Sequence, residues 1–84
     1  MTAIERAREL LGKSGSLAVV NGDREYSSSA RGIRPLTDLL SSNREMLRGA
    51  SVADKIVGKA AALLMAAGGV KEVYAGTIGR AAAK

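Results

Sequence analysis

An acid and two lysines within six consecutive positions are the side chains in this sequence best suited to chemistry. Asp54, Lys55 and Lys59 fall in the segment ADKIVGK, with Gly58 directly before the second lysine. A positioned carboxyl group can act as an acid or a base, and lysine ammonium groups bind anions such as phosphate. We interpret this cluster as the mouth of a pocket. The alternative is that Asp54 only caps a helix while both lysines extend into solvent.

Gly58 and Ser51 allow further interpretations of the same segment. Gly58 would let another backbone approach closely, and Gly58-Lys59 has the form of the end of a phosphate-binding P-loop. That motif also needs glycine at position 53 and serine or threonine at position 60, where this sequence has alanine, so we reject it. Ser51 could be a nucleophile only with an activating base, and the chain has no histidine to serve as one. We interpret Ser51 as the N-cap of the helix in which Asp54 and Lys55 are expected.

A second polar cluster precedes the only proline. It consists of three consecutive serines and two arginines, Ser27, Ser28, Ser29, Arg31 and Arg34. Hydroxyl groups and guanidinium forks suit phosphate or carboxylate groups, so Arg31 and Arg34 are candidate ligand-binding residues. The alternative, which we favour, is a solvated connector that leads into a helix opened by Pro35.

Composition excludes several classes of site. The 84 residues include no histidine and no cysteine, which removes the commonest general base, the usual zinc ligands and any disulfide. The net charge of +5 comes from thirteen Lys and Arg against eight Asp and Glu, scattered along the chain with only two tyrosines for stacking. Nucleic acid is therefore not an expected partner. No apolar run approaches the roughly 20 residues that cross a bilayer.

Apolar periodicity, turn residues and caps predict a hairpin, a third strand and helices before, between and after them. In chain order these elements are a helix at 2–11 that stops at Gly12, strands at 16–20 and 24–28 joined by Asn21-Gly22, a helix opened by Pro35, a main helix at 51–67, a strand at 70–75 and the start of a helix at 79–84.

The main helix is the most informative of these elements. Ser51 with Asp54 three residues later resembles a capping box, and Gly68-Gly69 would end the helix. No residue between Ala60 and Ala67 is polar, so we expect this helix to be buried on all sides. The order α-β-β-α-α-β-α predicts a single α/β domain over residues 1–84.

The stretch from Gly32 to Gly76 resembles a known family. The matching pieces are GIRPLTDLL and GASVADKIVGKAAALLMAAGGVKEVYAG, of which VADKIVGKAAA is the most specific. They resemble the uncharacterised family named domain of unknown function eighteen-ninety-three (DUF1893), whose fold belongs to the cytidine-deaminase-like superfamily. The resemblance implies a three-layer sandwich in which helices cover a sheet in the deaminase order.

The chain departs from the active deaminases of that superfamily. In those enzymes a His-Ala-Glu triplet opens the helix after the first hairpin, a Pro-Cys-x-x-Cys motif opens the next, and the zinc they hold activates water. The resemblance places the triplet on Val52-Ala53-Asp54, with valine for the metal ligand and a shorter acid, and the cysteine pair has no counterpart. Family members also run on further, so the domain is either naturally short or incomplete at its C-terminus.

We therefore expect a deaminase-like domain that is not a zinc-dependent deaminase, needs no cofactor and binds a small anionic or nucleotide-like ligand near Asp54, Lys55 and Lys59. An alternative from another class is a non-catalytic assembly or regulatory module that forms homo-oligomers. A third, weaker hypothesis is a metal-free enzyme that uses Asp54 and Lys59. A cytoplasmic homo-oligomer with no membrane partner is expected in either of the first two cases.

Overall fold

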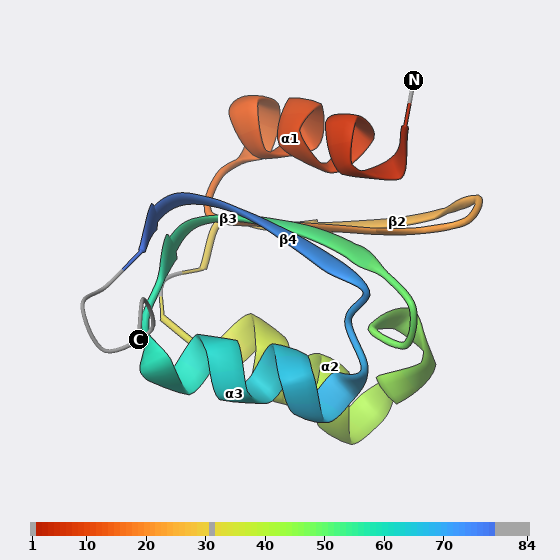
Figure 1. The fold of residues 1–84 in the computed structure, drawn as a ribbon, viewed down its shortest axis with the longest axis vertical. Coiled ribbons are helices and arrows are strands. Elements are labelled where there is room, and N and C mark those ends of the chain that lie inside the picture. Colours follow the sequence, from red (N-terminus) through yellow and green to blue (C-terminus); the bar gives the residue numbers. More distant parts are fainter. Residues whose placement is uncertain (1, 31, 79–84) are drawn as a thin grey trace.

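Three layers make up the fold. The computed structural model describes residues 2–30 and 32–78, in which helix α1 lies on one face of a four-stranded sheet and helices α2 and α3 lie on the other (Figure 1). The helices are α1 (Ala3–Ser14), α2 (Arg34–Ser42), α3 (Lys59–Gly68) and the short 3-10 helix η1 (Arg44–Met46), and the strands are β1 (Leu17–Asn21), β2 (Arg24–Ser28), β3 (Ser51–Val57) and β4 (Glu72–Ile78). The expected α/β class is confirmed. None of the helices in these residues is long and apolar enough to cross a membrane.

The sheet has the strand order β2-β1-β3-β4, and β1 is antiparallel to both of its neighbours. Strands β3 and β4 are parallel, and α3 makes the crossover that such a pair requires. The run Leu17–Val20 is buried throughout because both faces of β1 are covered. Leu17 and Val19 pack on the side of α2 and α3, while Ala18 and Val20 pack on the side of α1.

The predicted main helix is wrong in its first half, since residues 51–57 form the central strand β3. The spacing of Ser51 and Asp54 imitated a capping box, but Val52, Ile56 and Val57 supply the β-branched side chains that favour a strand. Strand β3 pairs with β1 on one edge and β4 on the other, which satisfies the backbone of a segment that is mostly buried. The observed order is therefore α-β-β-α-β-α-β, with a strand between the second and third α-helices.

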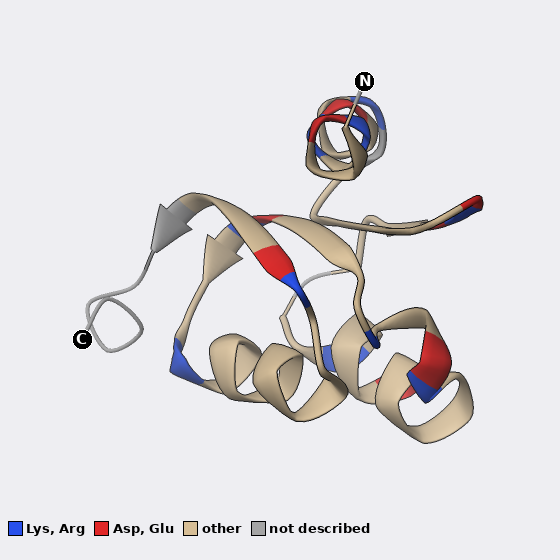
Figure 2. Ribbon diagram, turned by 45° about the vertical axis from the view of Figure 1, so that its right-hand side comes forward, with Lys and Arg blue, Asp and Glu red and all other residues tan. Residues whose placement is uncertain are grey.

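Helix α3 is apolar but not buried on all sides. Ala61 and Met65 face the core, and Gly68 lies so close to Leu47 that an added Cβ would come within 2.9 Å of its side chain. The opposite face, which includes Leu63 at 62% exposure, is open to solvent. Figure 2 shows how little charge α3 carries compared with α1. A uniformly apolar helix sequence thus did not mean uniform burial.

The remaining elements follow the predictions with shifted boundaries. Helix α1 continues through Gly12 to Ser14 and ends at Gly15, and the two turn residues of the hairpin are Gly22 and Asp23 because Asn21 pairs with Arg24. The helix opened by Pro35 is confirmed as α2, and the predicted third strand corresponds to β4. The helix expected at 79–84 lies outside the described residues.

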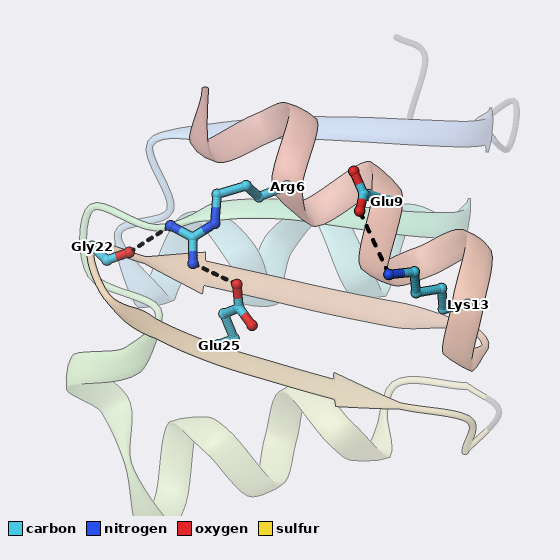
Figure 3. A network of polar contacts seen from close by, with 5 residues as sticks. All are labelled: Arg6, Glu9, Lys13, Gly22 and Glu25. Carbon is cyan, nitrogen blue, oxygen red and sulfur yellow. Dashed lines mark hydrogen bonds and ion pairs between the residues drawn. The ribbon is translucent and has the colours of Figure 1, made fainter. Parts of the chain in front are cut away.

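Helix α1 is fixed to the hairpin by its charged face. The guanidinium of Arg6 donates to the carbonyl oxygen of Gly22 at 3.0 Å and pairs with the carboxylate of Glu25 (Figure 3). Lys13 and Glu9 form a surface pair one turn apart, 3.5 Å between their charged atoms, which contributes little to stability. The contacts of Arg6 join α1 to the hairpin on one face of the sheet, and α2 and α3 lie on the other face.

Candidate functional site

A cavity of about 760 Å³ opens where α2 and α3 begin and β3 ends. Both helices start at the same end of the molecule, the left of Figure 1. The walls come from five separate segments, whose described lining residues are Gly15, Ser16, Leu17, Ser29, Gly32, Ile33, Asp54, Lys55, Ile56, Gly58, Lys59, Ala60 and Ala61. The volume lies within the range of about 300–1,000 Å³ that is usual for small-molecule sites.

The two helix starts at this cavity differ from the start of α1. Helix α1 has a complete capping box, in which Thr2 and Glu5 accept hydrogen bonds from each other's backbone N–H. Helices α2 and α3 begin after Ile33 and Gly58, with no side-chain cap and no acid in the first turn. In α3 the first intrahelical bond comes from Ala62, so the three preceding amides have no helix partner. Two electropositive helix ends therefore meet at one cavity.

Asp54 is the acidic residue among the described residues that line the cavity. It is half-buried on β3, and its Oδ1 accepts a hydrogen bond from the backbone N–H of Ile56 at 3.3 Å. Burial raises the pKa of the Asp54 carboxyl above its ordinary value, and hydrogen bonds from the backbone of Ile56 and Lys55 offset part of that rise. The ionised carboxylate accepts hydrogen bonds from a ligand, and the protonated form, which the raised pKa favours at acidic pH, can also donate one.

The raised pKa of Asp54 leads to a prediction for stability. Its folded pKa lies above its unfolded pKa, so the ionised carboxylate destabilises the fold at neutral pH and costs nothing below the unfolded pKa. Asp54→Asn should therefore raise the free energy of unfolding at pH 7 by about 1 kcal/mol or less, because the group is half solvated. The gain should shrink as the pH falls through the raised pKa of Asp54.

Thermal unfolding of the wild type and of Asp54→Asn, measured from acidic to neutral pH, tests this expected gain in stability. Asp23→Asn, in the exposed hairpin turn, removes the same charge and should change stability by less than about 0.5 kcal/mol. A loss of stability in Asp54→Asn at neutral pH would mean that the carboxylate is needed by the fold itself.

The structure separates the four other residues of the first predicted cluster. Lys59 is exposed at the first position of α3, and Lys55 is exposed on β3. Neither lysine makes an ion pair with another described residue, Asp54 included. Gly58 has no heavy atom near its missing Cβ, so no backbone approaches it. Ser51 is buried at the amino end of β3, away from the cavity, and is no helix cap.

Lys55 is shared between two cavities. It also lines a cavity of about 590 Å³ on the opposite face of the sheet, beside α1, where the guanidinium of Arg8 lies 4.3 Å from the centre of the Tyr74 ring. Its neighbour Ala53 packs on the α1 side, whereas Val52 packs on the side of α2 and α3. Lys59 and Asp54 are therefore better placed than Lys55 to act together on a ligand between α2 and α3.

The serine–arginine cluster is only partly at the cavity. Ser29 lines it, Ser27 is exposed on β2, and the Ser28 hydroxyl accepts a hydrogen bond from the backbone of Ala30. Arg34 is exposed at the first position of α2 and is not among the lining residues, while Arg31 lies outside the described residues. Of the described residues of this cluster, the structure thus brings Ser29 to the same cavity as Asp54.

Sequence reasoning missed the residues that hold this wall in place. The hydroxyl of Ser16 lies 3.0 Å from the carbonyl oxygen of Ser28 and 2.5 Å from that of Ala30. The preceding Gly15 packs against the backbone of Ser29. A glycine and a serine between a helix and a strand are too common in loops to indicate a site without the structure.

The zinc of the active deaminases does not fit this cavity. The whole chain has neither histidine nor cysteine, and Asp54 is the acid on the described walls. Among the described residues no three potential metal-ligating side chains come together. A zinc site needs three or four nitrogen, sulfur or carboxylate ligands, so no step of any reaction is assigned to zinc here.

The structure is that of a small α/β domain with a cavity at the starts of two helices. Residues 6–84 match the family described as Domain of unknown function (DUF1893), and the chain belongs to this family. No curated protein matches the chain. The family description assigns no activity, so the geometry of the cavity is the basis for a function.

Proposed function

We propose that this protein is a deaminase-like domain that lacks the zinc-binding motifs and binds a small anionic, nucleotide-like ligand between the starts of α2 and α3. The observation that carries the proposal is the meeting of two uncapped helix starts at a cavity lined by Asp54 and Lys59. Free amides at a helix start bind phosphate or carboxylate groups, and a lysine adds a full positive charge. As part of the same proposal the domain acts in the cytoplasm.

The arrangement of the elements supports the deaminase-like part of the proposal. A hairpin is followed by two successive helices on the same face of the sheet, and these two helix starts form the cavity. In active deaminases the two zinc motifs open the corresponding helices. On this proposal the first motif corresponds to Arg34-Pro35 and the second to Gly58-Lys59. The position expected for the first motif from the sequence, Val52-Ala53-Asp54, is wrong because these residues lie within strand β3 and open no helix.

The chemistry of the walls sets the kind of ligand. The amides of the first turn of α3 and the ammonium of Lys59 suit an anionic group, whereas Asp54 repels one when it is ionised. A ligand with a phosphate at the helix starts and hydroxyl or amino groups toward Asp54 satisfies both sides. Ser29 is a further lining residue, and its hydroxyl is a neutral hydrogen-bonding group.

Calorimetric titration with inorganic phosphate and with cytidine 5′-monophosphate tests the proposal. We expect saturable binding of both, tighter for the nucleotide, with a rise in melting temperature because the ligand binds the native state. Lys59→Ala should weaken binding about tenfold, the effect of losing one charge-assisted hydrogen bond. Its effect on the stability of the free protein should stay within about 0.5 kcal/mol, because the side chain is exposed.

The matched control is Arg24→Ala, which removes the same charge from an exposed position beside the hairpin turn. Because that turn lies at the far end of the sheet from the cavity, Arg24→Ala should bind both probes as the wild type does. Absence of saturable binding to the wild type, or equal weakening in the two variants, would overturn the proposal.

A further inference from the structure

A second surface of the molecule is apolar and open. It consists of the outer face of α3 and the adjoining edge of β4, which pairs with no further strand among residues 2–30 and 32–78, and we name it the α3–β4 surface. Its exposed residues are Ala60, Leu63, Ala66, Ala67 and Val73, of which Leu63 is 62% and Val73 46% exposed. An apolar groove of about 350 Å³ between α3 and β4 joins the two parts, with Ala66 and Val73 among its walls. Apart from Ala60, which also lines the cavity of the candidate site, none of these five residues belongs to that site.

The two edge strands of the sheet differ in the charged residues that would hinder pairing with another strand. Strand β2 carries Arg24 and Glu25, and the latter pairs with Arg6 of α1. The six residues from Val73 to Ile78 of β4 include no charged residue and no proline. Natural sheets protect free edges with such residues, because an unguarded edge offers N–H and C=O groups to another strand. In Figure 2 the charged residues of this segment lie at the start of β4, and the coloured part of the strand beyond them is uncharged.

We propose that the α3–β4 surface binds a second copy of this chain, with β4 of each copy paired antiparallel around a two-fold axis. Antiparallel pairing of two identical edges requires that axis, and it places both α3 helices on the same face of one continuous sheet. Leu63 and Ala66 of the two copies then pack together, and the alanines let the helices approach closely. A single contact thus covers both the free edge and the apolar helix face.

The size of the surface suits a dimer. Strand β4 has seven residues and runs about 23 Å, and a helix over a sheet edge adds roughly 20 Å of height, so the flat projection is roughly 500 Å². Stable dimers bury about 800 Å² of accessible area per partner. Protruding side chains make the accessible area of a surface larger than its flat projection, so the accessible area of this surface approaches that value. The charged β2 edges stay outside this contact, so assembly stops at two copies.

Sedimentation velocity over a range of micromolar concentrations tests the proposal. The wild type should be a dimer, and Leu63→Lys and Val73→Lys should each weaken dimerisation at least tenfold by burying a charge in an apolar contact. Both sites are exposed in the monomer, so the variants should keep their fold, as circular dichroism would verify. Ser27→Lys, exposed on the guarded edge strand β2, should remain a dimer.

A second measurement fixes the geometry. Because the chain has no cysteine, a single introduced cysteine can form a disulfide within the protein only with the same cysteine of a second chain. In a series of Val73→Cys, Tyr74→Cys and Ala75→Cys, at least one variant should oxidise to a covalent dimer, since directly paired strand residues lie within disulfide range. Ser27→Cys should not. A monomeric wild type, or a dimer that keeps its strength in both lysine variants, would overturn the proposal.

Discussion

Asn21→Asp is expected to destabilise the protein by about 2–4 kcal/mol. The side-chain amide of Asn21, at the end of β1, donates to the backbone carbonyl oxygens of Glu45, Met46 and Arg48 at 3.1, 3.2 and 2.8 Å. One amide thus holds the connection between α2 and β3 against the sheet. A carboxylate there has no donor and places a negative charge beside three carbonyl oxygens, so it removes the contacts and adds repulsion.

Chemical denaturation at neutral pH measures this loss, which is a large part of the roughly 4–13 kcal/mol expected for a domain of this size. Ser27→Asp is the control, because it adds the same charge at an exposed position of the hairpin and should change stability by less than about 0.5 kcal/mol. Asn21→Asp should recover part of its stability in acid, where a protonated carboxyl can donate one hydrogen bond. Equal stability of the two variants would show that the connection does not depend on Asn21.

The sequence predicted the elements whose pattern is local. The amphipathic spacing of α1, the hairpin around Asn21 and Gly22, and the proline that opens α2 each depend on a few neighbouring residues. Strand β3 was missed because SVADKIV carries both a cap-like spacing and β-branched residues, and its long-range pairing with β1 and β4 decides between them. Tertiary context overrides local propensity in such a segment.

The candidate site was predicted in part and for a partly wrong reason. Asp54 and Lys59 line one cavity at the start of a helix, but that helix begins after Gly58, and Asp54 reaches the cavity from the middle of strand β3. Ser29 was placed in a separate cluster, because nothing in the sequence shows that residues 25 positions apart face one cavity. Parallel helix starts at one end of a sheet are a property of the topology, which the sequence encodes only through pairing over long distances.

Gly15→Ala is expected to destabilise the protein by about 2–4 kcal/mol and to disturb the candidate cavity as well. Gly15 ends α1 with a φ of 135° and a ψ of −117°, a backbone conformation that L side chains rarely adopt. An added Cβ would also lie 2.8 Å from the Cα of Ser29, closer than carbon atoms approach without displacement. Since a backbone atom must move, the shift should displace Ser29 from the cavity wall.

Gly22→Ala separates the clash from the backbone strain. Gly22 has a φ of 63° in the hairpin turn, but no heavy atom lies within 4 Å of its missing Cβ, so alanine should cost only about 1 kcal/mol. Denaturation and phosphate titration of the two variants under conditions where both are folded compare these effects. Gly15→Ala should be the less stable and should also bind phosphate more weakly, because only this substitution displaces the segment that carries Ser29. Equal losses of stability with unchanged phosphate binding would mean that strain alone acts at Gly15 and that the wall at Ser29 is not rigidly tied to the end of α1.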